Sequence, residues 1–299
     1  MGSTCASPRP VGEVWATRRL KEQKPSYVSL SLTDVSPQTA SQRQRHRAVP
    51  VHHALVDRIQ ASLGTESLAY AVYGSQARGT ATDRSDIDVL QLVDSRPGVH
   101  SAGPVNVTSY LPFTLREMAM RGSLFVLHLK TDGIILHDPL SVLRDVIACY
   151  VAPSSYEPLL VELRAAAQAL EFQPGQEQYQ DKLLRMGVYI LRTAIYAHFA
   201  GLGAPVFDVP TAAAIINDMD ICQALNLRYK QTADHGDLQI LHRALKVMLR
   251  SELHNEWGSP EALAVALSHT RPYAASLLTQ VLLDGDVGLD YTVLAPPPL

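Results

Sequence analysis

Short apolar runs separated by polar turns dominate the chain between residues 50 and 150. Ala69–Tyr73 is one such run, and a second run reaches Val93 from the carboxylate-containing stretch that begins near Asp86. Pro104–Tyr110 alternates between apolar and polar residues. Runs and alternation of this length predict β-strands, so we expect at least three strands in this part of the chain.

Helical spacing of apolar residues surrounds these strands. It predicts a helix over His52–Leu63, before the first strand, and another over Leu115–Met120. Ser123–Lys130 is strongly apolar and fits either a helix or a strand, because periodicity does not separate the two in short runs. Ile134–Leu136 predicts one more strand, and Leu140–Tyr150 predicts a helix that leads out of this region.

The second half of the chain follows a helical period throughout. The clearest helix is Asp181–Ala200, where small and apolar residues trace one continuous stripe. Pro158–Leu170 and Asp237–Ser251 are amphipathic in the same way. Shorter helices are expected from Thr211 to Asn217, from 261 to 267 and from 273 to 283. This half of the chain therefore predicts a helical bundle without strands.

The strongest chemical signal is a pair of carboxylates, Asp86 and Asp88, within the second predicted strand. Residues two apart in a strand point to the same face, so both carboxylates project together while Ile87 faces the other way. Adjacent carboxylates repel each other, which makes a purely structural role unfavourable. Mg²⁺ relieves such repulsion, and it prefers one or two carboxylates together with substrate phosphates.

A small-residue turn at Gly74 and Ser75 precedes the carboxylates and follows the first predicted strand. Glycine lets the backbone approach a phosphate, and the serine offers a hydroxyl and an N–H donor. Arg78 can neutralise phosphate charge, and Ser85 stands directly before Asp86. We therefore interpret Gly74, Ser75, Arg78 and Ser85 as nucleotide-binding candidates, and Asp86 and Asp88 as catalytic metal ligands.

The combined motif, Gly-Ser-x-Ala-Arg-Gly followed by Ser-Asp-Ile-Asp, spans residues 74–88. It resembles the polymerase β-type nucleotidyltransferase superfamily, and most closely its small bacterial branch of minimal and kanamycin-type nucleotidyltransferases. The resemblance implies Mg²⁺ or Mn²⁺ as the metal and an NTP, by default ATP, as the donor. It implies the transfer of a nucleoside monophosphate to a hydroxyl of a protein, an RNA or a small molecule, with release of pyrophosphate.

The resemblance and the pattern together predict an α+β fold with three parts. Residues 1–50 are expected to be a poorly ordered segment punctuated by prolines. Residues 51–150 are expected to form a nucleotidyltransferase domain with a mixed β-sheet flanked by helices. Residues 151–299 are expected to form an all-α helical-bundle domain.

The chain departs from the superfamily pattern at one position. The superfamily carries a third carboxylate on the next core strand, where it binds metal and can take the proton of the incoming hydroxyl. The matching positions here are Asn106 and Thr108, and neither is acidic. Possible substitutes for this carboxylate are Glu117, Asp132 and Asp138. The simpler interpretations are that Glu117 lies on a helix, Asp132 lies in a turn and Asp138 caps a helix.

A second face of the Asp181–Ala200 helix carries cationic and aromatic residues, namely Lys182, Arg185, Tyr189, Arg192 and Tyr196. This face is either solvated or, as the resemblance implies for an all-helical second domain, closes over the triphosphate. In the second case Lys182 and Arg185 bind the nucleotide. Arg192 and His198 also resemble the Arg-x(4–6)-His motif of HEPN ribonucleases. Because His198 falls on the apolar stripe and Arg192 does not, a core histidine is the better interpretation.

The composition limits the cellular setting and the partners. The 299 residues are 46% hydrophobic with a formal net charge of −3, so no global field favours nucleic acid. The three cysteines are widely spaced, which fits a reducing cytoplasm and argues against zinc or a disulfide framework. No apolar run reaches the length of a membrane span, and residues near the start lack the apolar core of a signal peptide.

Two other functions remain open from the sequence. The absent third carboxylate favours a catalytically impaired fold that acts as a nucleotide sensor or antitoxin, with a cognate toxin–antitoxin partner. A nucleotide second-messenger synthase of phage defence shares the same fold, although its signature differs after the carboxylate pair. Replacement of Asn106 by aspartate distinguishes an impaired transferase from an intact one.

Overall fold

The computed structural model describes residues 53–63, 67–83, 85–171 and 175–283. The segment expected to be poorly ordered, residues 1–50, lies outside these ranges, as does the proline-rich stretch at the other end. All described residues fall into one compact unit. The predicted division near residue 150 therefore stays a prediction.

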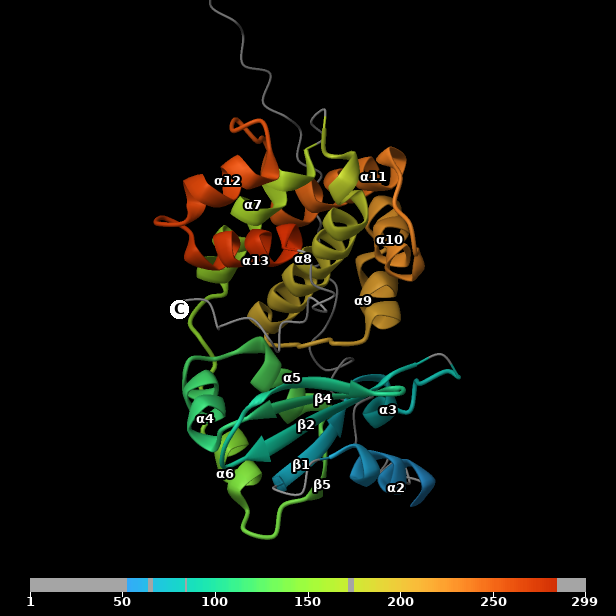
Figure 1. The fold of residues 1–299 in the computed structure, drawn as a ribbon, viewed down its shortest axis with the longest axis vertical. Helices are drawn as coiled ribbons and strands as arrows, with labels where there is room; N and C mark the ends of the chain where they lie inside the picture. The colour runs from blue at the N-terminus through green and yellow to red at the C-terminus, as the bar shows by residue number, and fades with distance from the viewer. Residues whose placement is uncertain (1–52, 64–66, 84, 172–174, 284–299) are drawn as a thin grey trace, which may run out of the picture. The chain divides into compact units, whose positions relative to one another are not determined.

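A five-stranded mixed sheet forms the first half of the described chain (Figure 1). Its strand order is β3-β4-β2-β1-β5, with only the β2–β4 pair parallel. The strands are β1 (Ser67–Tyr73), β2 (Ile87–Val93), β3 (Gly98–Ala102), β4 (Val105–Tyr110) and β5 (Ile134–His137). The α+β class and the mixed sheet expected from the sequence are thus confirmed.

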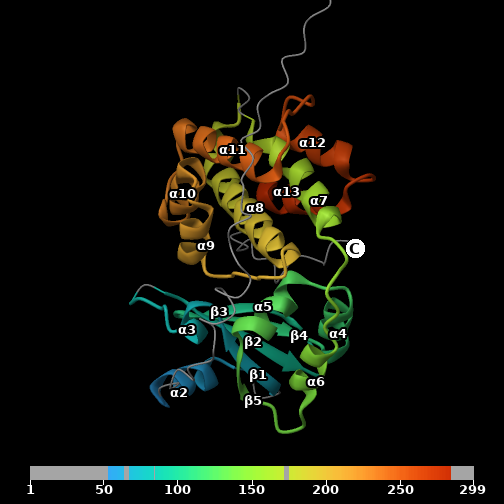
Figure 2. The ribbon, with the colours of Figure 1, turned by 180° about the vertical axis from the view of Figure 1, so that it is seen from behind.

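Alternation along the strands produces two apolar layers, one on each face of the sheet. One face buries Ala71, Leu90 and neighbouring side chains against α4 (Pro112–Met120), α5 (Leu124–Asp132) and α6 (Val142–Ala148). The other face packs Val72 and Val89 against Ile59 of α2 (His53–Ser62). Figure 2 shows these helices around the sheet. The central strands β1 and β2 are consequently buried on both faces.

Two elements differ from the sequence expectation. Gly74–Arg78 is a one-turn helix, α3, where a simple turn was expected. The edge strand β3 was not predicted, because all five of its residues are exposed and show no apolar alternation. The ambiguous segment after Ser123 is the helix α5, whose first turn Ser123 caps by accepting a hydrogen bond from the Phe125 N–H.

Helices make up the remainder of the described chain. They are α7 (Glu157–Ala167), α8 (Gln180–Gly201), α9 (Val209–Ile216), α10 (Met219–Asn226), α11 (His235–Leu249), α12 (Pro260–Leu267) and α13 (Pro272–Leu282). Short 3₁₀ segments, Gln168–Leu170, Glu177–Tyr179 and Leu227–Tyr229, join or extend them. The 22-residue α8 contacts α7, α10, α11 and α13, so it is the central helix of this region.

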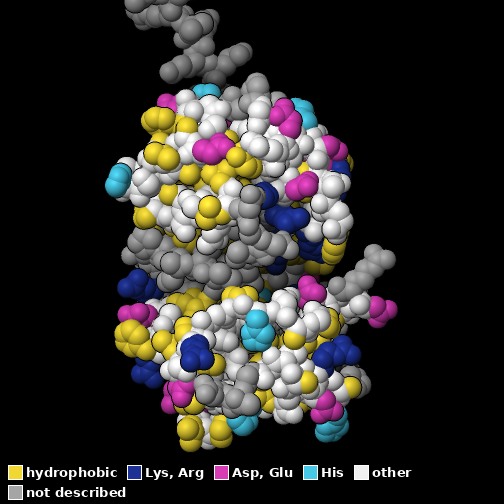
Figure 3. Space-filling model, viewed as in Figure 1, with side chains coloured by type: hydrophobic (Ala, Val, Ile, Leu, Met, Phe, Trp, Pro, Cys, Tyr) yellow, Lys and Arg dark blue, Asp and Glu magenta, His cyan; other side chains and the backbone are white. Residues whose placement is uncertain are grey.

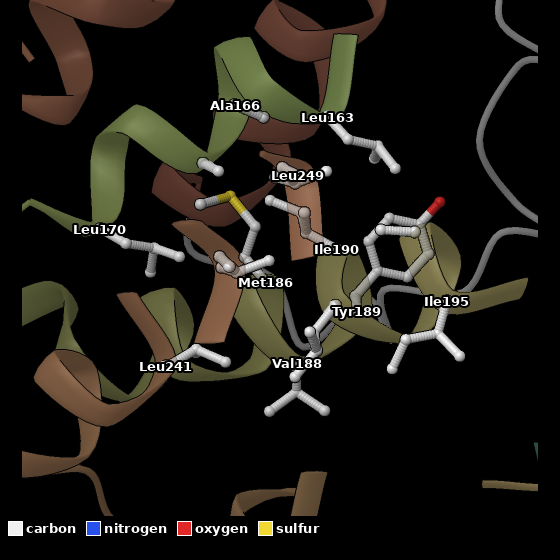
Figure 4. Close-up of a cluster of buried hydrophobic side chains, with 14 of the residues drawn as sticks. Leu163, Ala166, Leu170, Met186, Val188, Tyr189, Ile190, Ile195, Leu241 and Leu249 are labelled. Atoms are coloured by element: carbon white, nitrogen blue, oxygen red, sulfur yellow. The ribbon is translucent and has the colours of Figure 1, made fainter. Parts of the chain in front are cut away.

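The helical core is almost entirely apolar. Figure 4 shows Met186 and Ile190 of α8 pointing toward Leu163 of α7 and Leu249 of α11. Gly187 lies in the same contact, where a Cβ atom would stand 2.2 Å from Cδ2 of Leu241. The missing side chain therefore lets α8 and α11 approach each other closely.

No helix among the described residues is long and apolar enough to cross a lipid bilayer. Acidic and basic side chains are interspersed on the face seen in Figure 3. The mixture agrees with the small formal net charge of −3.

Candidate functional site

Three neighbouring strands place a row of polar side chains on one face of the sheet. Tyr73 of β1 pairs with Asp88 of β2, and Asp88 pairs with Asn106 of β4. By strand alternation these residues share the face that is covered by α4, α5 and α6. The row therefore brings together Tyr73, which precedes the small-residue turn, and the motif carboxylate Asp88. It also includes Asn106, one of the two positions that match the third carboxylate of the superfamily.

Gly74 brings the backbone directly against the Asp88 carboxylate. Its φ of +72° is a conformation that side-chain-bearing residues rarely adopt. A Cβ atom at this position would lie 2.7 Å from Oδ2 of Asp88, which is closer than any real contact. The backbone angle thus favours glycine here, and any side chain would displace the Asp88 carboxylate. The two ends of the motif, separate in the sequence, meet at this contact.

Asp86 lies immediately before β2, where it is exposed, whereas Asp88 within the strand is half-buried. A tight turn precedes Asp86. The Thr82 N–H donates to Oγ of Ser85 at 2.9 Å, and the Ser85 N–H donates to the Thr82 carbonyl at 2.9 Å. The Ser85 hydroxyl, a nucleotide-binding candidate from the sequence, therefore closes the turn that leads into the carboxylate pair. Ser75, the other serine candidate, is half-buried on α3 beside Gly74.

The strand register singles out Asn106 as the residue beside Asp88. Thr108, the other candidate from the sequence, pairs with Leu90 one step deeper in the sheet and is buried. Oγ of Ser101 on the edge strand β3 donates to Oδ1 of Asn106 at 2.7 Å. The amide is thereby held in place by the strand that the sequence did not predict.

Of the three substitute carboxylates, two are engaged in the structure. Asp138 accepts hydrogen bonds from the backbone N–H groups of Leu143 (3.2 Å) and Arg144 (3.0 Å), so it caps α6. Asp132 is ion-paired, as described below. Glu117 lies half-buried on α4. The described residues contain no group of three or more His, Cys, Asp or Glu side chains arranged to hold a metal ion.

Arg78, expected to contact phosphate, is held by two carboxylates from distant segments. Its Nη1 donates to Oδ2 of Asp132 on α5 at 2.8 Å, and its Nε lies 3.4 Å from Oδ1 of Asp208, which precedes α9. Nε2 of His128 is 3.3 Å from the same Nη1 and 3.4 Å from Oδ2 of Asp132. Burial opposes ionisation of Asp132, yet the hydrogen bonds and charges of His128 and Arg78 outweigh it and lower the pKa of Asp132.

An aromatic stack lies beside these ion pairs. The His128 ring stacks on Phe207 with ring centroids 4.4 Å apart and an interplanar angle of 13°. The same His128 ring meets Tyr73 edge-on at 5.5 Å, and Phe207 meets Tyr196 of α8 edge-on at 5.2 Å. We call Arg78, His128, Asp132, Phe207 and Asp208 the Arg78 cluster. The sequence alone does not indicate His128, Phe207 or Asp208 as site residues, because their contacts join segments that are far apart in the chain.

Lys182 and Arg185 lie near the start of α8, away from the end that meets the Arg78 cluster. Arg185 and Tyr196 are eleven positions apart on the helix, or about 16.5 Å at a rise of 1.5 Å per residue. Nζ of Lys182 donates to the Leu283 carbonyl at 3.2 Å. Tyr189, on the same predicted face, is buried, and its hydroxyl is 2.6 Å from that of Tyr273. The structure therefore buries the aromatic members of this face in the helical core.

Arg192 and His198 have different surroundings on α8. The Arg192 guanidinium lies 5.9 Å from the centre of the Tyr196 ring, and its Nε donates to the Tyr196 hydroxyl at 3.4 Å. Burial lowers the pKa of His198, and the positive charge of Arg250 lowers it further. His198 is half-buried, and its Nε2 has no hydrogen-bond partner among the described residues, so its interpretation as a core histidine stays a prediction.

The donor set at this end of the sheet fits a hard divalent cation that also binds substrate. Asp86 and Asp88 supply two carboxylates, and the register adds only the neutral side chain of Asn106. Two carboxylates with open positions suit Mg²⁺ shared with phosphate oxygens better than a cage made only of protein ligands. Asp86 and Asp88 thus stay the metal ligands predicted from the sequence.

Comparison with known protein families gives a match in the same region of the chain. Residues 56–111 match the family described as "Nucleotidyltransferase domain". This part of the chain is thus similar to a nucleotidyltransferase domain, which supports the polymerase β-type superfamily indicated by the motifs.

Among solved structures, a nucleotidyltransferase-like protein from Exiguobacterium sibiricum is similar at 16% identity, with a TM-score of 0.29. The match covers 76% of this chain and 85% of that chain. No curated protein matches the sequence.

Proposed function

We propose that this protein transfers a nucleoside monophosphate from an NTP to an acceptor hydroxyl, with release of pyrophosphate. ATP is the donor expected from the motif resemblance. The observation that carries the proposal is the contact between Gly74 and the Asp88 carboxylate, because it joins a phosphate-approachable backbone to a metal-binding group.

The chemistry forms one bond and breaks one. The acceptor oxygen bonds to the α-phosphorus, and the bond from that phosphorus to the bridging oxygen of pyrophosphate breaks. Gly74 and Ser75 would hold the triphosphate, and Asp86 and Asp88 would hold the cation, which when bound supplies positive charge to the attacking and leaving oxygens. The amide of Asn106 takes no proton at neutral pH. The proton of the acceptor hydroxyl therefore passes to water or to a carboxylate elsewhere in the site.

A second function is favoured by Asn106. With an amide in place of a carboxylate beside Asp88, the domain could bind nucleotide without turning it over and act as a sensor or as part of a toxin–antitoxin pair. Nucleotide binding is common to both functions. Label transfer is expected only from the enzyme.

The test is transfer of label from each α-labelled NTP, with Mg²⁺ or Mn²⁺, into the protein, RNA and small-molecule fractions of a cell extract. The Asp86→Ala/Asp88→Ala double variant is the control. Label that requires the wild-type carboxylates supports a transferase, and the labelled fraction gives the acceptor class. Binding of NTP without label in any fraction favours the sensor and excludes the transferase.

A further inference from the structure

We propose that Arg78 is a positioning residue, through which the Phe207–Asp208 segment controls the shape of the Gly74–Ser75 turn and hence its affinity for nucleotide. The inference rests on the proposed nucleotide site. It replaces the sequence-based expectation that Arg78 contacts phosphate directly. The control comes from the helical part of the chain, and no comparison with known proteins assigns it.

The first argument is the charge around Arg78. Its guanidinium lies against two carboxylates, Asp132 at 2.8 Å and Asp208 at 3.4 Å, and its side chain is only 19% exposed. The guanidinium donates a hydrogen bond to Asp132 and forms an ion pair with Asp208, so partners on two segments restrain the side chain. The two carboxylates already offset the charge of the guanidinium. A triphosphate would gain little from such a group.

The second argument is the short distance along the chain from Arg78 to the turn. Gly74 and Arg78 are the first and last residues of α3, which is a single helical turn. Ala77 of the same turn is buried in the apolar layer with Val72 and Val89. Because one helical turn is stiff, a shift of Arg78 moves the Gly74 backbone, which already touches the Asp88 carboxylate.

The third argument is that the adjacent residues Phe207 and Asp208 contact the histidine and the arginine of the Arg78 cluster, respectively. Phe207 stacks on the His128 ring, and Asp208 approaches the Arg78 guanidinium. Asp208 also caps α9, since its Oδ2 accepts from the Thr211 N–H at 3.0 Å and from the Thr211 hydroxyl at 2.7 Å. The start of α9 is therefore connected to α3 through one side chain. Movement of that segment is expected to reach the turn.

Two substitutions separate this role from direct phosphate binding, because the two roles predict opposite signs. Asp132→Asn and Asp208→Asn each remove one negative charge beside Arg78 while keeping the side-chain size, and asparagine still caps α9. If Arg78 binds phosphate, either change frees it and tightens NTP binding. If Arg78 positions the turn, either change loosens α3 and weakens NTP binding. We expect weakening of about tenfold, the size of coupling found within one ion-pair network.

Asp218→Asn is the matched control for Asp208→Asn. Asp218 caps α10 through the Ile221 N–H at 3.0 Å, so the substitution makes the same change at a second helix start. We expect its NTP affinity to equal that of the wild type.

The experiment is calorimetric titration of the full chain with each of the four NTPs and Mg²⁺. Circular dichroism checks that every variant is folded at the titration temperature. Hydrogen exchange of the Gly74–Arg78 amides gives a readout besides affinity, and we expect faster exchange in Asp208→Asn than in Asp218→Asn. The exchange measurement keeps the inference testable even if Asp132→Asn does not fold.

The outcomes are distinct. Weaker binding and faster exchange support the positioning role. Tighter or unchanged binding in both cluster variants overturns it while leaving the proposed function intact. A wild type that binds none of the four NTPs removes the proposed function itself, and the inference falls with it.

Discussion

Two glycines show how differently the sheet and the helical bundle use a missing side chain. At Gly187 a Cβ atom would strike Leu241 at 2.2 Å and Leu170 at 2.9 Å, so the neighbours are apolar side chains of a close-packed core. At Gly74 it would strike the Asp88 carboxylate at 2.7 Å, so the neighbour is a polar group at the candidate site. The first glycine stabilises the fold, whereas the second brings a charged group to the backbone. Stability and function are thus expected to depend on different close contacts.

The largest expected effect is on catalysis, and it comes from Asp88, the polar neighbour of Gly74. Asp88→Asn removes one of two carboxylates available to a cation, and we expect turnover in the label-transfer assay to fall about a thousandfold, or ~4 kcal/mol. Thermal unfolding should change little, because the side chain is only half-buried. Asp145→Asn, an exposed residue of α6, is the control and should retain activity. Full activity in Asp88→Asn would contradict the metal assignment.

The apolar side of the comparison predicts a loss of stability instead. Gly187→Ala forces Leu241 and Leu170, both buried, to move within a close-packed core, which typically costs 1–3 kcal/mol, and we expect about 3 kcal/mol here. Gly201→Ala, at the end of the same helix, is the control, because its Cβ would meet only Tyr156 at 4.0 Å. Urea unfolding should show a lower midpoint for the first variant only. Equal midpoints would mean that α8 and α11 have room to separate.

Gly74→Ala sharpens the comparison by separating backbone strain from the carboxylate contact. Gly203 has the same φ of +72° and nothing within 4 Å of its Cβ position, so Gly203→Ala measures the strain alone, about 1–2 kcal/mol. We expect Gly74→Ala to lose that stability and, in addition, most NTP binding. Titration with NTP after correction for the folded fraction gives the comparison. Similar NTP affinity in both variants would show that the Asp88 contact is not needed for the site.

Asn106→Asp tests whether the polar row is incomplete. The register places residue 106 beside Asp88, so an aspartate there supplies a third carboxylate and a group that can accept a proton. We expect label transfer to rise about tenfold, or ~1.4 kcal/mol. Asn106→Ser lacks a carboxylate and serves as the control. If transfer falls instead, Asn106 has a binding role that a charge disrupts.

Much of the sheet was predictable because its signals are local. Ala69–Tyr73 and the run to Val93 are buried strands whose apolar residues are adjacent in sequence, and residues 86–88 carry the motif in a single stretch. Pro104–Tyr110 alternated clearly enough to place Asn106 on the correct face. Strand β3 was not predicted because all of its residues are exposed, so its sequence has no apolar alternation that would indicate a strand.

The Arg78 cluster was not predictable, for the opposite reason. Arg78 follows Gly74, a glycine expected to approach phosphate, by four residues. The local sequence would look the same whether this arginine binds phosphate or carboxylates. Its partners Asp132 and Asp208 are separated from it by other elements, and only the tertiary fold brings the three side chains together. Local sequence therefore located the turn and the carboxylates but not the residues that hold the turn in place.

The smallest expected effect concerns the pH dependence of that cluster. His128 and Arg78 lower the pKa of Asp132, so its contribution to stability is present at pH values above about 3.9, the ordinary value, and is lost as pH falls through the lowered pKa. Asp132→Asn lacks this titration. The difference in free energy of unfolding between wild type and variant should therefore shrink as the pH falls below about 4.

Urea unfolding at several pH values measures this difference, with the exposed Asp145→Asn as the control. A constant difference for Asp132→Asn would show that Asp132 stabilises the fold equally whether its carboxyl group is charged or neutral. Uncharged contacts of residue 132 would then hold α5 to α3. A shrinking difference would show that charge fixes Arg78. Charge-based positioning of the turn depends on this second result, because a guanidinium held by neutral contacts alone would remain available to a phosphate.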